Sequence, residues 1–284
     1  MKSDMSGTAR LFFCFGPPKS GTTLLQRMLN LHPEVSCPSE HIFHQVHKGM
    51  KDLFKNYNQL LRLIDRRTGG QGATLIMPEI VDLIFCEAVR AIIHQAANGK
   101  AIMGANDNTM LHHLDFYDEW FEQPRMIAIF RNPIDQGLSG LHHNLRLARE
   151  ENDPRHEQLV TQHGGPEGFL RKNMRLFVRD VDTWRTFSAG RKNVYMVRYE
   201  DLVADRKAAA REIFSFLNAD IRDEILDPIV AATDIDQMRV ASSNPEFFRR
   251  GASDMGREEL RSDLRRELAG LAGEALEWLG YRID

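Results

Sequence analysis

Short, uninterrupted apolar runs recur along the chain, and a segment of helical periodicity follows each of them. Continuous apolar runs of this length are typical of strands that are buried on both faces of a parallel sheet. Strands that alternate with helices predict an α/β fold with a mostly parallel central sheet flanked by helices. We expect the strands at residues 11–15, 101–103, 126–130 and 194–197.

Two longer stretches lie between the expected strands. Residues 42–98 keep a helical period apart from a glycine-rich break at 69–72, which predicts a helical insertion. Residues 146–165 are polar and charged and include a glycine pair near their end, so we expect a mobile loop or a lid. The chain shows neither an internal repeat nor a linker-like break, which predicts a single domain over residues 1–284.

Composition narrows the classes of protein to consider. The 284-residue chain is 42% hydrophobic and 27% charged, as in an ordinary globular enzyme, and its formal net charge of −3 disfavours nucleic-acid binding through overall charge. Three cysteines are too few for a disulfide framework, and the apolar run at 11–15 is too short to span a bilayer. Because the N-terminal residues lack the layout of a secretory signal, we expect a cytoplasmic protein.

The first expected strand runs into the turn GPPKSGTT at residues 16–23, directly before a helix. A helix N-terminus presents unpaired N–H groups and a partial positive charge, so it is a natural anion site. Gly21 lets the backbone approach a ligand, Lys19 adds a cation, and hydroxyl donors come from Ser20, Thr22 and Thr23. A Walker A loop places its lysine after the last glycine, whereas Lys19 precedes Gly21. The alternative is an ordinary turn with a surface lysine.

A second candidate anion site follows the expected strand at 126–130, where residues 131–139 read RNPIDQGLS. Pro133 suits the first turn of a helix. Arg131 at the strand end and Ser139, about two helical turns later, could together clamp a phosphate. The alternative is that Arg131 pairs with a carboxylate at the edge of the sheet.

These two motifs, in this order, resemble those of the sulfotransferases that use 3′-phosphoadenosine-5′-phosphosulfate (PAPS) and release PAP, a family with a P-loop-like α/β fold. The resemblance implies that residues 20–23 hold the 5′-phosphate and that Lys19 contacts the sulfuryl group. It also implies that Arg131 and Ser139 hold the 3′-phosphate. PAPS is therefore the expected co-substrate.

Three weaker matches extend the resemblance toward the C-terminus. The segment 199–201 is similar to a Tyr-Glu-Asp segment whose tyrosine reaches toward the adenine, and 233–238 looks like an adenine-contacting stretch with two departures. The segment 248–251 is similar to a loop that closes on the 3′-phosphate, although the Gly-Asp-Trp that usually follows is replaced by Ser-Asp-Met. The residues to which the matches assign donor binding are Tyr199, Thr233, Met238, Arg249, Arg250 and Gly251.

The expected general base follows the first helix. The segment 32–41 resembles the tyrosylprotein and carbohydrate branches of the family, in which a glutamate just after this helix is the base. Glu40 holds that position, and His41 and His44 are alternatives. A carboxylate base needs a partly desolvated setting that raises its pKa.

The residues after the middle strand depart from the resemblance. Many relatives have a lysine there, whereas this chain has Asn106, which can donate only a neutral hydrogen bond, followed by Asp107, a further candidate base. A sulfuryl group carries less charge than a phosphoryl group, so hydrogen-bond donors and lysine can replace a metal ion. His41, His44 and His47 recur every three residues, but no cysteine or carboxylate completes a site, and we expect no metal.

The sequence therefore predicts an enzyme that moves the sulfuryl group of PAPS to a hydroxyl or amine by in-line displacement. The expected acceptor is a small molecule, sugar or lipid, with a peptide tyrosine also open, and neither nucleic acid nor a membrane span is expected. One alternative is a magnesium-dependent P-loop kinase or NTPase. Another is a PAP-binding relative without catalysis, which the asparagine at position 106 favours.

Overall fold

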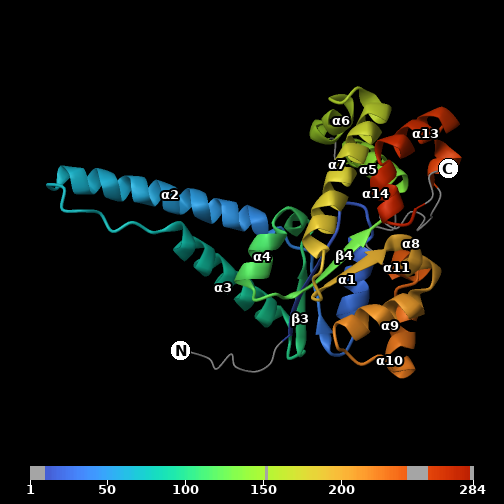
Figure 1. Ribbon diagram of the computed structural model, residues 1–284, viewed down its shortest axis with the longest axis horizontal. Helices are drawn as coiled ribbons and strands as arrows, with labels where there is room; N and C mark the ends of the chain where they lie inside the picture. The colour runs from blue at the N-terminus through green and yellow to red at the C-terminus, as the bar shows by residue number, and fades with distance from the viewer. Residues whose placement is uncertain (1–9, 151–152, 242–254, 282–284) are drawn as a thin grey trace.

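A five-stranded parallel sheet forms the centre of the computed structural model, which describes residues 10–150, 153–241 and 255–281 (Figure 1). The strand order is β2-β3-β1-β4-β5. This sheet confirms the predicted α/β class; β2, with two residues, is too short to stand out as an apolar run. The strands are β1 (Arg10–Phe15), β2 (Val35–Ser36), β3 (Ile102–Asn106), β4 (Arg125–Phe130) and β5 (Val194–Arg198).

Alternate residues of β1 pack into two separate cores. Phe13 and Phe15 belong to the larger hydrophobic cluster, and Phe12 and Cys14 belong to a second cluster on the other side. Successive side chains of a strand point to opposite faces, so a strand buried in both clusters lies between two helical layers. This explains why the strand reads as a continuous apolar run in the sequence.

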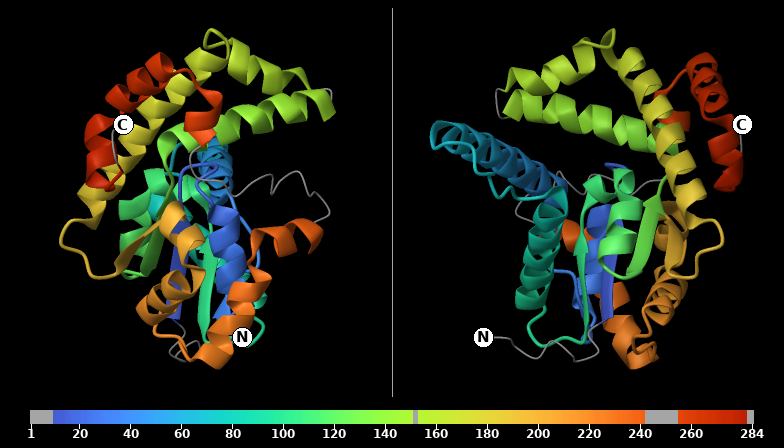
Figure 2. Two further views of the ribbon diagram at one scale, coloured as in Figure 1. Left: turned by 90° about the vertical axis from the view of Figure 1, so that its right-hand side faces the viewer. Right: turned by 60° about the vertical axis from the view of Figure 1, so that its left-hand side comes forward.

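Helices cover both faces of the sheet (Figures 1 and 2). The helices that contribute to the second cluster are α1 (Thr22–Leu31), α8 (Tyr199–Ala204), α9 (Arg206–Phe216), α10 (Asp223–Ala232) and α11 (Ile235–Ala241). Those that contribute to the larger cluster include η1 (Asn108–His112), α3 (Pro78–Ala96), α4 (Leu114–Trp120), α7 (Gly165–Ser188), α13 (Ser262–Leu271) and α14 (Gly273–Trp278). The larger cluster also includes Phe43 of α2 (Phe43–Arg67) and Ile134 and Leu138 of α5 (Pro133–Glu150), and the other helices are α6 (Pro154–Thr161) and α12 (Met255–Glu259).

The expected helical insertion consists of α2 and α3, and α2 projects away from the body of the molecule (Figure 1). Asn58 of α2 holds the returning chain, because its side chain exchanges hydrogen bonds of 2.7 and 2.9 Å with the backbone of Ile76. Large apolar side chains such as Leu53 and Leu60 are exposed on this helix. Within the described part of the chain, no helix is long and apolar enough to cross a membrane.

The segment 146–165, which we expected to be a mobile loop, is largely helical. It contains the end of α5, all of α6 and the start of α7, and Figure 2 shows α5 and α6 side by side at the top of the molecule. Asp153 caps α6 by accepting a 3.0 Å hydrogen bond from the N–H of Arg155. The prediction was wrong because Val160 is the buried residue of α6, so the helix lacks an apolar period.

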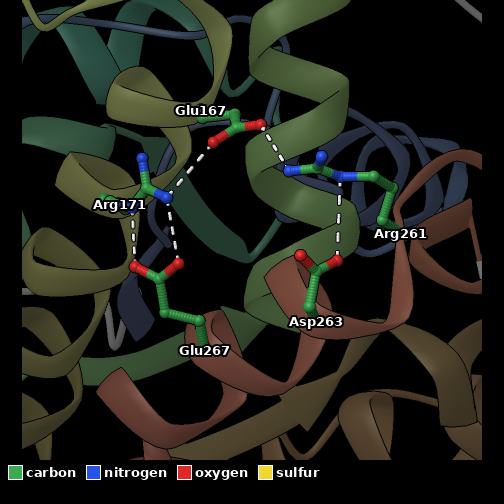
Figure 3. Close-up of polar contacts among 5 residues, drawn as sticks. All are labelled: Glu167, Arg171, Arg261, Asp263 and Glu267. Atoms are coloured by element: carbon green, nitrogen blue, oxygen red, sulfur yellow. Dashed lines mark hydrogen bonds and ion pairs between the residues drawn. The ribbon is translucent and has the colours of Figure 1, made fainter.

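An exposed ion-pair network joins α7 to α13 (Figure 3). Arg171 of α7 makes a two-pronged contact with Glu267, at 2.6 and 2.9 Å, and also contacts Glu167 at 3.2 Å. Arg261 extends the network by pairing with Glu167 at 3.1 Å and with Asp263 at 3.7 Å. The network links α13 to α7, whose pocket-facing residues are described below.

Candidate functional site

The pocket of interest lies where the parallel strands end. Its volume is about 770 Å³. Lys19 after β1, Asn108 after β3, Arg131 after β4 and Tyr199 after β5 all line it, and α5 and α7 supply further walls. After β1 the chain forms β2 and β3 on one side of it and then crosses to form β4 and β5 on the other side. Ligands of open α/β sheets bind at the carboxyl ends of strands near such a switch point.

The loop between β1 and α1 has the features of an anion site. Lys19 and Gly21 have φ angles of 71° and 98°, in the left-handed region that favours glycine. The Ser20 hydroxyl is buried, and its Oγ has no hydrogen-bond partner among the described residues. Gly21 precedes α1 without a capping side chain. A buried hydroxyl of this kind, next to an uncapped helix N-terminus, fits a phosphate.

Arg131 and Tyr199 form a stack beside this loop. The guanidinium carbon of Arg131 lies 4.6 Å from the centroid of the Tyr199 ring, and both side chains are buried. Burial raises the pKa of Tyr199, so the ring stays neutral. The N–H of Asn132 donates a 2.9 Å hydrogen bond to Glu200, which ties the end of β4 to the start of α8. A fixed, buried guanidinium at a strand end is suited to a second anion.

The other predicted donor-binding residues fall into three groups. Ser139 and Met238 line the same pocket. Thr233 differs from the prediction: it lies in the core, and its hydroxyl donates a 2.8 Å hydrogen bond to the backbone oxygen of Ile229. Helix-internal hydrogen bonding explains why a threonine is accommodated there. Residues 249–251 lie outside the described residues.

Glu40 lines the pocket near Lys19. Its carboxylate accepts a 2.6 Å hydrogen bond from the side chain of Asn108, and a backbone bridge with Asn106 anchors it beside the end of β3. Burial and then the charge of Asp107 raise the pKa of Glu40, whereas Asn108 and Lys19 oppose the rise. A raised pKa brings a carboxylate closer to the range in which it can accept a proton effectively.

The two candidate histidines face other partners. His41 lies 2.9 Å from the hydroxyl of Ser39 and stacks on Phe43 at 4.5 Å. His44 stacks on His113 at 3.9 Å. Neither histidine lines the pocket that contains Lys19 and Glu40. The geometry therefore favours Glu40 over both histidines as the candidate general base.

Asp107 holds a structural position, and Asn106 is the buried last residue of β3. The carboxylate of Asp107 accepts hydrogen bonds from the N–H of Phe43 at 2.7 Å and from the N–H and hydroxyl of Thr109 at 2.8 and 2.6 Å. Asn106 is fully buried, and within the described chain its side-chain N and O atoms lack hydrogen-bond partners. Neither residue lines the pocket, so the structure does not bring these two predicted catalytic residues to the site.

Comparison with known proteins identifies the fold and its family. A family model described as the sulfotransferase family matches residues 12–223, which is more than half of the chain. The chain belongs to the sulfotransferase family. This match includes the Lys19 loop, Glu40, Arg131 and Tyr199. No curated protein matches the sequence of this sulfotransferase significantly.

Solved sulfotransferase structures share the fold at low sequence identity. A mouse sulfotransferase (SULT7A1) complexed with PAP is 17% identical, with a TM-score of 0.58, and the match covers 95% of this chain and 85% of that one. A sulfotransferase from Alicyclobacillus acidocaldarius is 18% identical, with a TM-score of 0.54 and coverage of 95% and 96%. The sulfotransferase domain of the Synechococcus olefin synthase is 20% identical, with a TM-score of 0.52 and coverage of 100% and 99%.

The pocket of this sulfotransferase includes α5 residues that sequence reasoning missed. His143 and Arg146 line it together with Ser139. Residues at positions 139, 143 and 146 share one face of a helix, so the spacing was a usable signal once α5 was known to continue past the predicted loop boundary. Burial lowers the pKa of Lys19 to about 8; the charge of Arg146 adds to this effect, and Glu40 opposes it.

The wall formed by α7 was also missed. Phe169, Leu176 and Phe177 give it an apolar part, and Arg179 and Asp180 give it a charged part. These residues follow the Lys19 loop by about 150 positions, so only the folded chain brings them together. In the part of the chain that the structure describes, no group of three or more His, Cys, Asp or Glu residues is arranged to hold a metal ion.

Proposed function

We propose that this sulfotransferase uses PAPS as its sulfuryl donor and transfers the group to a hydroxyl or amine of a small molecule, sugar or lipid. The observation that carries the proposal is the presence of two candidate anion sites in one pocket, the Lys19 loop and the Arg131–Tyr199 stack. The mouse relative of the same fold is complexed with PAP, a ligand that has one phosphate on the 3′ and one on the 5′ oxygen of its ribose. That likeness supports the assignment of the two sites.

Each end of the donor has its own set of residues in this proposal. The buried hydroxyl of Ser20, the hydroxyls of Thr22 and Thr23 and the first N–H groups of α1 hold the 5′-phosphate. Arg131 and Ser139 hold the 3′-phosphate, and Tyr199 and Met238 contact the adenine. A buried, ring-stacked arginine is already desolvated and oriented before the donor binds, so binding costs little side-chain conformational entropy.

The transfer needs one proton acceptor and a stabilised leaving group. The acceptor oxygen or nitrogen forms a bond to sulfur, the bond from sulfur to the bridging oxygen breaks, and its electron pair stays on the 5′-phosphate of PAP. Glu40 takes the proton of the acceptor, and Lys19 stabilises the charge on the leaving oxygen. Asn108 orients Glu40 through its 2.6 Å hydrogen bond.

Acceptors enter, in this proposal, between Glu40 and α7. Phe169, Leu176 and Phe177 provide apolar contact, which suits an acceptor with a hydrocarbon or ring surface. Arg179 and Asp180 add polar groups at the same wall; burial raises the pKa of Asp180. This mixture accommodates a small molecule that has both apolar and polar parts.

Titration calorimetry with PAP and with ATP, each with magnesium and with EDTA, tests the donor assignment. PAP should bind equally well with and without EDTA, and Arg131→Ala should weaken PAP at least about tenfold, because a charge-assisted contact is lost. Labelled PAPS and an acceptor library then test transfer. Magnesium-dependent binding of ATP, with PAP inert, would overturn the proposal, and PAP binding without transfer to any acceptor would favour a non-catalytic relative.

A further inference from the structure

Two cations line the same pocket. Lys19 comes from the loop after β1, and Arg146 comes from the last turns of α5. The positive charge of Arg146 helps to lower the pKa of Lys19, and the negative charge of Glu40 opposes this effect. Two like charges that converge in a partly desolvated pocket repel each other, so their arrangement favours an anion between them.

Arg146 is held in place for such a role. Its guanidinium contacts the carboxylate of Glu150, one helical turn later, at 2.6 Å, and also lies 3.5 Å from Nδ1 of His143. Its side chain is 17% exposed, so the group is largely desolvated although it lines the pocket. An anchored, weakly hydrated guanidinium loses little freedom when it binds an oxyanion.

The position of Arg146 along α5 separates it from the other phosphate site. Ser139, on the same face of the helix, is two turns nearer the N-terminus of α5, which corresponds to about 10 Å along the helix axis. Arg131 precedes that N-terminus. Arg146 therefore lies farther along α5 from Arg131 than Ser139 does, and it lines the same pocket as Lys19 and Glu40.

We infer that Arg146 and Lys19 together bind the sulfuryl group of the donor, with Arg146 supplying the second cation at the reacting centre. This inference rests on the proposed function, because it takes PAPS as the donor. Asn106, the residue at the end of β3, is uncharged and does not line the pocket, so it cannot supply this charge. Arg146 would stabilise the sulfuryl oxygens while the bond from sulfur to the bridging oxygen breaks and the electron pair passes to PAP.

The experiment compares the dissociation constants of PAPS and PAP for each variant, which requires no acceptor. Arg146→Gln should weaken PAPS about ten- to hundredfold and change PAP by less than about threefold, because only PAPS carries the sulfuryl group. Arg146→Lys should recover part of the PAPS affinity, since it restores the charge without the planar fork. Arg149→Gln, an exposed arginine on the same helix, is the matched control and should change neither constant.

Two further measurements separate binding from a structural role. Glu150→Gln releases the guanidinium from this ion pair but keeps its charge, so PAPS affinity should fall by less than in Arg146→Gln, and PAP affinity should stay within about threefold. In the wild type, PAPS affinity should fall as the pH rises through about 8, where Lys19 loses its proton. The charge of Arg146 lowers the pKa of Lys19, and the charge of Glu40 raises it. The charge of Lys19 in turn helps to lower the pKa of His143. Arg146→Gln should move the decline to higher pH, because removing a cation raises the pKa of Lys19.

The outcomes distinguish this inference from the proposed function. A wild type that binds neither PAP nor PAPS would contradict the proposed function itself. A wild type that binds both, with Arg146→Gln either unaffected or equally weakened toward both, would overturn the role of Arg146 and leave the proposed function standing. Selective loss of PAPS, together with the alkaline shift, supports the inference.

Discussion

Gly21 lies directly against the ring of Tyr199, and a Cβ atom at Gly21 would come within 2.4 Å of Cδ2 of that ring. The same ring carries the guanidinium of Arg131 on its face. One glycine therefore sets the distance between the Lys19 loop and the arginine stack. Its φ of 98° places a second restriction on the same position, because side chains rarely adopt that conformation.

Gly21→Ala should weaken PAP at least about tenfold and lower the free energy of unfolding by about 1–3 kcal/mol. The new methyl group must displace the Tyr199 ring or the loop, and either movement separates the two anion sites. Calorimetry with PAP and urea denaturation measure the two effects. Gly49→Ala, in α2, is the matched control: nothing lies within 4 Å of its Cβ position, and it should stabilise the protein slightly. Normal PAP binding by Gly21→Ala would contradict this account.

Tyr199→Leu and Tyr199→Phe separate the ring from its hydroxyl. Leucine removes the aromatic face under Arg131, so PAP affinity should fall about three- to thirtyfold, which corresponds to the usual strength of a desolvated cation–π contact. Phenylalanine keeps the face and should bind PAP within about threefold of the wild type. Calorimetry at one pH and salt concentration gives the comparison. If phenylalanine were as harmful as leucine, the hydroxyl and not the stack would orient the site.

The rate of transfer should depend on pH in two directions. Glu40 acts as a base only when ionised, so kcat/KM should rise as the pH increases through its raised pKa. Lys19 acts only when protonated, so kcat/KM should fall as the pH rises through about 8. A pH series with any acceptor found by screening measures both limbs. Glu40→Gln should abolish the rise of kcat/KM at low pH. If this variant keeps the rise, a group other than Glu40 is responsible for it.

The sheet could be predicted from the sequence because its signal is local. Phe12 and Phe13 are neighbours in the chain yet bury in opposite cores, so the strand reads as one apolar run whichever way it faces. The Lys19 loop and Arg131 were found for the same reason, since a turn that joins a strand to a helix is a short segment. Their roles in binding stay predictions, whereas the α/β fold is confirmed.

The rest of the site depends on contacts that no local pattern contains. Arg146 resembles any other polar helix residue until α5 is seen to run beside the Lys19 loop. Asp107 seemed a candidate base because a carboxylate at a strand end suits catalysis, but the fold uses it to bind the N–H of Phe43, 64 positions earlier. Val160 shows why the segment 146–165 was misjudged, because a helix with one buried residue has no period to detect.

Glu200→Gln should lower the free energy of unfolding by about 1–3 kcal/mol and weaken PAP as well. The two carboxylate oxygens accept hydrogen bonds from the N–H of Asn132 at 2.9 Å and from the hydroxyl of Tyr281 at 2.6 Å. An amide has only one oxygen, so one donor faces an N–H₂ group. Denaturation of Glu200→Gln, Tyr281→Phe and the double variant forms a cycle. Strictly additive effects would contradict direct coupling between the two side chains.

Asp107→Asn should lose stability, whereas Glu40→Gln should lose sulfuryl transfer. Asp107 accepts hydrogen bonds from the backbone of Phe43 and Thr109, so an amide there turns a donor toward a donor and should cost about 1–3 kcal/mol of unfolding free energy. The pocket partly desolvates the carboxylate of Glu40, but the side chain still reaches solvent, so its glutamine variant should keep near-normal stability and PAP affinity. It should lose about 10²–10⁴-fold in transfer, because the base is absent. Urea denaturation and transfer at saturating PAPS measure the two properties. If Asp107→Asn folded normally and lost transfer as deeply as Glu40→Gln, Asp107 would share the proton-accepting role that we assign to Glu40.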